Sequence, residues 1–206
     1  MLKKIFLKKG KEESLKRFHP WVFSGAIHHF DQEPEEGEVV EVCTLEGGHI
    51  AYGHYQIGSI MVRVLTFGDE EIDTRFYEDR LATAFNVRKC IGVAESESND
   101  TYRLVHGEGD NLPGLVIDVY GKTAVMQAHS VGMHMDRMKI AEALKNVMEG
   151  RIENIFYKSE TTLPFKAGLG QENGFLLGGS KDDVASENGL KFHVDWLKGQ
   201  KTGFFV

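Results

Sequence analysis

Residues 39–66, VVEVCTLEGGHIAYGHYQIGSIMVRVLT, decide the fold of the first part of the chain. The runs Val39–Cys43, His49–Tyr55 and Ile60–Thr66 are rich in β-branched and aromatic residues, which favour strands. The two gaps between these runs contain glycine, which marks turns. Several short strands at such close spacing predict a compact β-barrel. A polar run at 68–71 follows, so we place this first domain at residues 1–70.

Charge is unevenly distributed along the chain. The 206 residues carry a net charge of −7, yet residues 1–28 contain seven lysines and arginines against two glutamates. The remaining residues hold 17 basic and 29 acidic side chains. A basic end on an acidic chain indicates a polyanion site there. A solvated, lysine-rich surface would give the same pattern, so charge alone does not decide between the two.

Residues 71–186 are predicted to form a second domain, of the α+β class. Asp73 or Thr74 can cap a helix, because either side chain accepts a hydrogen bond from a first-turn amide. Leu115–Tyr120 is almost continuously apolar, as in a strand that is buried on both faces. The glycine-rich run 107–114 lies between two predicted strands. It is therefore interpreted as a tight loop and not as a dinucleotide site, whose glycines must open a helix.

The last part of the chain has weaker signals. Residues 160–187 are glycine-rich and predict a loop and a hairpin. Glu187-Asn188-Gly189 predicts a turn into a strand at Leu190–Val194. The final residues, 203–206, are apolar, which is unusual for a chain terminus. We therefore expect the natural protein to continue beyond Val206.

The run His19–Gly25, HPWVFSG, is the most distinctive in the chain. It follows Lys16 and Arg17, so cations and flat rings lie within a few residues of each other. Ammonium and guanidinium groups bind RNA phosphates, while aromatic rings can stack on unpaired bases. We expect Lys16 and Arg17 to contact RNA, whereas Trp21 and Phe23 are predicted to fill the core of the small domain.

Other classes of site find little support. No apolar run is long enough to span a bilayer and no signal peptide is evident, so a cytoplasmic protein without membrane contact is expected. Cys43 and Cys90 are far apart and are interpreted as reduced thiols. The adjacent His28 and His29 are a poor metal pair, because neighbours in a strand point to opposite faces. No residue lies in a recognisable nucleophile setting.

Three stretches together resemble one family: bacterial SAM-dependent methyltransferases that carry an N-terminal PUA domain and modify a cytosine of large-subunit ribosomal RNA. The matching stretches are residues 15–27 (LKRFHPWVFSGAI), 102–118 (YRLVHGEGDNLPGLVID) and 199–205 (GQKTGFF). They occur in the family's order and extend from one end of the chain to the other.

The resemblance implies an α+β protein with three parts. These are an N-terminal PUA-like β-barrel at 1–70, a central α+β domain at 71–186, and the start of a methyltransferase domain at 187–206. The Rossmann-like methyltransferase domain would be absent except for this lead-in. In the family the lead-in motif lies near the cofactor, which predicts cofactor contacts for Lys201, Thr202, Gly203 and Phe204. The family's catalytic cysteine lies further along the chain, so no catalytic residue is assigned here.

We therefore expect an RNA-binding and positioning portion of an rRNA cytosine-C5 methyltransferase that is inactive alone. S-adenosylmethionine would serve the full-length enzyme, and none is expected to bind this portion. Ribosomal RNA is the expected partner, and homodimer formation is left open. The expected RNA contacts are Lys8, Lys9, Lys11, Lys16, Arg17 and His19. The alternatives are a stand-alone RNA-binding adaptor without enzyme activity, and a methyltransferase that acts on another RNA.

Overall fold

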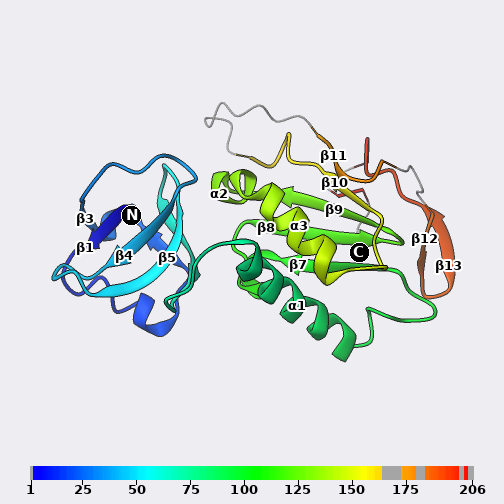
Figure 1. Cartoon of the computed structure of the whole chain (residues 1–206), viewed down its shortest axis with the longest axis horizontal. Coiled ribbons are helices and arrows are strands. Elements are labelled where there is room, and N and C mark those ends of the chain that lie inside the picture. The colour runs from blue at the N-terminus through cyan, green and yellow to red at the C-terminus, as the bar shows by residue number, and fades with distance from the viewer. Residues whose placement is uncertain (1, 164–172, 180–183, 200–201, 204–206) are drawn as a thin grey trace. The chain divides into compact units, whose positions relative to one another are not determined.

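The computed structural model describes residues 2–163, 173–179, 184–199 and 202–203. The chain divides into two compact units. The first comprises residues 1–72 together with 130–135, and the second comprises residues 73–129 and 136–206. Figure 1 labels their helices and strands. The boundaries at 70 and 186 that we place from the sequence stay predictions.

The first unit is built on a six-stranded sheet in the order β2-β6-β5-β4-β1-β3. All neighbouring strands are antiparallel except β1 and β4, which are parallel. Register shifts in several of the pairs bend the strands, as bulges do. The strands are β1 (Lys4–Leu7), β2 (Trp21–Phe23), β3 (Ile27–Phe30), β4 (Val39–Cys43), β5 (His49–Tyr55) and β6 (Ile60–Thr66). Strands β4, β5 and β6 are thus confirmed at the bounds predicted from the sequence.

Gly53, in the middle of β5, lies where no side chain fits. A Cβ atom on this residue would be 2.4 Å from the Arg63 carbonyl oxygen and 2.7 Å from Cγ1 of Val62, both on β6. The register of the β5–β6 pair also shifts between Tyr52 and Gly53. Glycine in a strand interior often marks such a close approach of two backbones.

Two short 3₁₀ turns complete the first unit around β2. The turn η1 (Leu15–Arg17) precedes the strand and η2 (Ser24–Ala26) follows it. Phe18 ends η1 in the left-handed region, with φ 62° and ψ 29°, and its side chain is 72% exposed. A bulky residue with positive φ is uncommon.

The second unit contains a five-stranded sheet in the order β11-β10-β9-β8-β7, in which only β9 and β10 are parallel. Two helices, α1 (Thr74–Cys90) and α3 (Arg137–Val147), lie over one face of this sheet, as Figure 1 shows. The predicted cap is confirmed, because the Asp73 carboxylate accepts a hydrogen bond from the Phe76 amide at 2.9 Å. The strands are β7 (Thr101–His106), β8 (Leu115–Tyr120), β9 (Thr123–Ala128), β10 (Asn154–Tyr157) and β11 (Gly174–Leu177).

A hairpin after β11 packs against the same sheet. Strands β12 (Val184–Glu187) and β13 (Leu190–His193) form a hairpin through the predicted Asn188-Gly189 turn. The predicted hairpin within 160–187 is wrong for the described residues, because β11 pairs with β10 and β12 pairs with β13. A core cluster joins sheet and hairpin: Tyr120, Val125, Phe156, Ala185, Val194 and Trp196.

The edge strand β7 has two of its backbone carbonyls covered by side chains. Nδ2 of Asn99 donates to the Thr101 carbonyl at 3.0 Å, and Nε of Arg88 donates to the Arg103 carbonyl at 2.9 Å. The same Arg88 guanidinium forms an ion pair with the Asp110 carboxylate. Asp110 belongs to the 3₁₀ turn η3 (Gly107–Asp110). Gly107, Asn111 and Gly114 all have positive φ, so the tight-loop interpretation of 107–114 is confirmed.

A short helix, α2 (Val131–Met135), was not predicted, and it belongs to the first unit although its neighbours in sequence belong to the second. Gly132 of α2 lies against His54 of β5, since a Cβ on Gly132 would be 2.1 Å from the imidazole. This packing depends on a residue pair 78 positions apart, which no local pattern reveals.

Candidate functional site

The N-terminal cations fall into two groups in the structure. Lys3, just before β1, forms an ion pair with Glu38 at 2.8 Å, and Lys4 of β1 forms one with Glu41 at 3.0 Å. The hydrogen bond from Lys3 to Glu38 raises the pKa of the Lys3 ammonium. These two lysines are therefore balanced by carboxylates and add little to a field that attracts anions.

Lys16 and Arg17, predicted to contact RNA, are exposed on η1. The Lys16 ammonium is 2.8 Å from the Glu13 carboxylate, and this hydrogen bond raises the pKa of Lys16 and lowers that of Glu13. Nε of Arg17 donates to the Glu13 carbonyl at 3.2 Å. Exposed ion pairs of this kind contribute little free energy, so Lys16 can exchange Glu13 for a phosphate at small cost.

Lys8, Lys9 and Lys11 lie in the segment between β1 and η1. The Lys8 ammonium donates to the Gly25 carbonyl at 3.0 Å. Within the described part of the chain, Lys9 and Lys11 have exposed side chains and no acidic partner. Because their charges are not balanced locally, these two lysines are the best placed of the predicted contacts to bind a phosphate.

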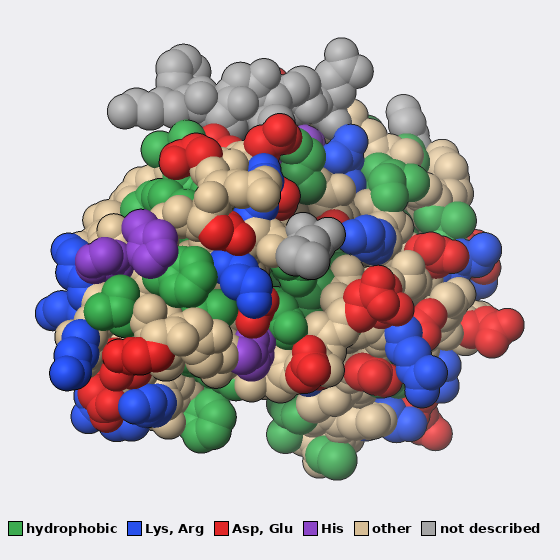
Figure 2. Space-filling model, turned by 60° about the vertical axis from the view of Figure 1, so that its left-hand side comes forward, with side chains coloured by type: hydrophobic (Ala, Val, Ile, Leu, Met, Phe, Trp, Pro, Cys, Tyr) green, Lys and Arg blue, Asp and Glu red, His purple; other side chains and the backbone are tan. Residues whose placement is uncertain are grey.

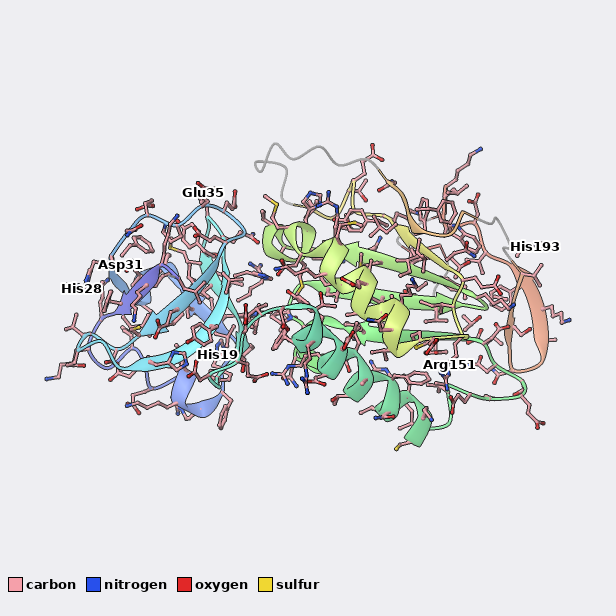
Figure 3. The ribbon with its side chains drawn as sticks, in the orientation of Figure 1. His19, His28, Asp31, Glu35, Arg151 and His193 are labelled. Carbon is pink, nitrogen blue, oxygen red and sulfur yellow. The ribbon has the colours of Figure 1, made fainter. Side chains whose placement is uncertain are left out.

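An aromatic group lies next to these cations. His19, labelled in Figure 3, has Nδ1 3.2 Å from the backbone nitrogen of Trp21, and its ring meets the Trp21 ring edge to face. The prediction that Trp21 and Phe23 fill the core is wrong for Phe23, which is 46% exposed. Trp21 is half-buried, and the buried residue of β2 is Val22 between them.

The two signs of charge are mixed on one face of the molecule. Figure 2 shows Lys and Arg side chains interspersed with Asp and Glu side chains over the face that is drawn. The chain as a whole carries a net charge of −7. Attraction of a polyanion must therefore come from a local group of cations such as Lys9 and Lys11.

The lead-in segment is only partly described, since Lys201 and Phe204 lie outside the described residues. Thr202 is buried, and its hydroxyl donates to the Asp118 carboxylate at 2.6 Å. The Tyr120 hydroxyl lies 3.0 Å from Oγ1 of Thr202. Asp118 also accepts two hydrogen bonds from the Arg103 guanidinium, at 2.7 and 2.9 Å, which raise the pKa of Arg103. We call these four residues the Asp118 cluster.

A tight turn spans Asp195 to Gly199, closed by a hydrogen bond from the Gly199 amide to the Asp195 carbonyl at 2.7 Å. The Lys158 ammonium donates to the Gly199 carbonyl at 2.6 Å, and burial lowers the pKa of Lys158. Gly199 tolerates no side chain, because a Cβ would be 2.3 Å from the Asp195 carbonyl oxygen. A Cβ on Gly203 would be 2.9 Å from Cα of Trp196. The predicted cofactor role of this segment stays a prediction. The single hydroxyl proton of Thr202 is already donated to Asp118, so that hydroxyl does not fit a donor to SAM.

The described residues also bear on membrane spans and metal sites. No helix among residues 2–163, 173–179, 184–199 and 202–203 is long and apolar enough to cross a membrane. The same residues contain no group of three metal-ligating side chains. His28 and His29 do not diverge as predicted, because their Nδ1 atoms are 2.8 Å apart and their rings meet edge to face.

The two cysteines are expected to differ in reactivity. Cys43 is buried in β4, and burial, with Glu41 nearby, raises the pKa of its thiol to about 11. Cys90 is exposed at the end of α1. Because only the thiolate is alkylated, iodoacetamide at about pH 8 should label Cys90 and spare Cys43 in the native protein. Peptide mass spectrometry would check this. Labelling of Cys43 and Cys90 at equal rates would show that Cys43 is accessible. As a control, the Cys90→Ser variant should stay unlabelled until the protein unfolds.

Comparison with known proteins places this geometry in context. A PUA-like domain family matches residues 5–67. The chain is 37% identical over 205 residues to "Ribosomal RNA large subunit methyltransferase I" of Vibrio parahaemolyticus, covering 98% of this chain and 51% of that protein. The protein of the same name from Klebsiella pneumoniae is 36% identical over 207 residues, with the same shares covered. The chain thus spans about half the length of the curated relatives it matches.

Solved structures share the fold. One is described as a candidate SAM-dependent methyltransferase from Streptococcus mutans, with a TM-score of 0.74 and 18% identity, covering 94% of this chain and 48% of that one. Another with the same values is described as a candidate methyltransferase complexed with SAH. At this identity the likeness concerns the fold alone. The sequence relatives and the PUA-like match confirm the resemblance predicted from the three motifs: nearly the whole chain is similar to about half of the large-subunit ribosomal RNA methyltransferase I proteins.

Proposed function

We propose that this chain is the RNA-binding and positioning portion of a SAM-dependent methyltransferase that acts on C5 of a cytosine in large-subunit ribosomal RNA. The observation that carries the proposal is the pair of lysines without an acidic partner among the described residues, Lys9 and Lys11, in the same PUA-like unit as the exposed ring of Phe23. Cations for phosphates and rings for unpaired bases are the two elements that single-stranded RNA recognition requires. The partner is ribosomal RNA, and the place of action is the cytoplasm.

The second unit would orient the bound RNA towards a catalytic domain that follows the lead-in segment. The Asp118 cluster supports this role, because it holds Thr202 on the central sheet, while Lys158 of the same unit binds the Gly199 carbonyl. S-adenosylmethionine would supply the methyl group to the full-length enzyme. The 206 residues alone are expected neither to bind SAM tightly nor to transfer methyl groups. Titration calorimetry with SAM tests the first expectation, and tight binding would contradict it.

RNA binding should weaken steeply with salt, because each phosphate contact releases a counterion. Replacing Lys9 and Lys11 together by alanine should reduce the slope of log K against log salt by about 2, roughly one for each lost contact. The measurement is fluorescence anisotropy with a fragment of large-subunit ribosomal RNA, at salt concentrations from about 50 to about 200 mM.

The matched control replaces Lys145 and Lys191 by alanine. These lysines are also exposed, lie in the second unit, and change the net charge by the same amount. Equal losses in both double variants would show a general charge effect and no specific site. Absence of binding at low salt would contradict the proposed function. Parallel titrations with transfer RNA would distinguish the RNA classes.

A further inference from the structure

We propose that a cavity beside β2 holds one unpaired base of the bound RNA, an inference that rests on the proposed function. The cavity has a volume of about 300 Å³ and lies wholly within the first unit. Trp21 and Phe23 of β2 line it, together with Lys11 and Ser14. Figure 3 places His19, whose ring contacts both aromatic residues, in the same part of the unit.

The alternation of side chains along β2 builds the aromatic wall. Val22 belongs to the core cluster of the first unit and is 2% exposed, so Trp21 and Phe23 share the opposite face of the strand. Their rings meet edge to face, with centroids 6.3 Å apart. The buried aliphatic side chains of Leu7 and Leu15 also line the cavity. A flat ring that enters the cavity therefore finds both aromatic and aliphatic surface.

The rim of the cavity favours an anion. The Lys11 side chain is exposed there, and the Lys8 ammonium is bonded to the carbonyl of Gly25, another lining residue. None of the described residues that line the cavity is acidic. Glu12 and Glu13, which follow Lys11 in sequence, lie 3.9 Å and 2.8 Å from the Lys16 ammonium. A phosphate can thus lie beside Lys11 while its base lies against Phe23.

The size of the cavity selects an unpaired base. A volume of about 300 Å³ is at the lower limit of small-molecule sites and accommodates a single planar heterocycle. A base within a duplex cannot enter, because both of its faces are stacked on neighbours. Recognition of RNA by stacking on aromatic side chains is typical of loops, bulges and ends. The exposure of Phe23, which a core residue would not need, has a use in this arrangement.

The test compares decaadenylate with an abasic oligonucleotide of the same length, which has the same phosphates and no bases. The intact chain should bind decaadenylate about tenfold more tightly, within the range for loss of a base stack. Phe23→Ala should remove this preference by weakening only the binding of decaadenylate. Lys11→Ala should weaken both complexes by the same factor. Decaadenylate should quench the tryptophan emission, and the abasic oligonucleotide should not. The change can be assigned to Trp21, because Trp196 is buried in the second unit.

Two controls make the outcomes distinct. Phe23→Tyr keeps the ring and should retain the preference. Ile57→Ala removes another exposed apolar side chain of the first unit, outside the cavity, and should change neither affinity. If Phe23→Ala binds both oligonucleotides as the parent does, or if ribosomal RNA binds while decaadenylate does not, the base site is wrong and the proposed function stands. If no RNA binds at low salt, both are overturned.

Discussion

Asp118→Ala is expected to lower the free energy of unfolding of the second unit by about 3 kcal/mol. Asp118 is fully buried in the middle of β8 and accepts hydrogen bonds from Arg103 and Thr202. Its removal leaves the Arg103 guanidinium without its partner and the Thr202 hydroxyl without its acceptor. Breaking a buried ion pair by removing one member costs about 3–5 kcal/mol. The lower value applies because the Arg103 side chain is 35% exposed and can recruit water.

The measurement is urea unfolding followed by the emission of Trp196, which packs beside Tyr120 in the same core cluster. Both proteins would carry Trp21→Phe, so that the signal reports the second unit alone. Lys122→Ala is the matched control, because Lys122 pairs with Glu153 at the surface of the same unit. Loss of such an exposed pair costs at most about 1 kcal/mol. Equal midpoints for the two variants would mean that the Asp118 cluster does not hold the unit together.

Gly53→Ala is expected to destabilise the first unit by about 3 kcal/mol, at the upper end of the usual cost of overpacking. The added methyl group would collide with the Arg63 carbonyl, a backbone atom that no rotamer change can move away. Relief requires β5 and β6 to separate, which breaks their hydrogen bonds. Hydrogen–deuterium exchange followed by mass spectrometry would show faster exchange in peptides from residues 49–66.

Gly25→Ala serves as the control for this substitution. Gly25 lies in η2 of the same unit, and a Cβ there would have nothing within 4 Å. Its exchange pattern should match that of the parent protein. A Gly53→Ala protein with unchanged protection of β5 and β6 would show that the strands can move apart without loss of stability.

Much of the secondary structure was predictable because its signals are local. Strands β4, β5 and β6 follow runs of β-branched and aromatic residues, and their bounds agree with the prediction. The Asn188-Gly189 hairpin turn also follows from the sequence, since both residues have the positive φ that such a turn requires. The partner of β11 was not predictable, because pairing with β10 depends on contacts between distant parts of the chain.

The candidate site was less predictable, for a physical reason. Alternation in β2 shows that Val22 faces one way and its neighbours the other, but it does not tell which face meets the core. Choosing the larger rings for the core gave the wrong answer for Phe23. Asp118 is different, because a lone carboxylate in an apolar strand indicates a buried partner. Only the folded structure identifies that partner as Arg103 together with Thr202.

The covering of β7 by Arg88 and Asn99 has a consequence for self-association. An uncovered sheet edge is a template to which another chain can add a strand, and this is a common route to aggregation. At β7 an incoming strand would have to displace the side chains bonded to the Thr101 and Arg103 carbonyls. It would also compete with the Arg88–Asp110 ion pair. Intermolecular sheet extension at this edge is therefore disfavoured, and two copies of the chain are not expected to join through β7.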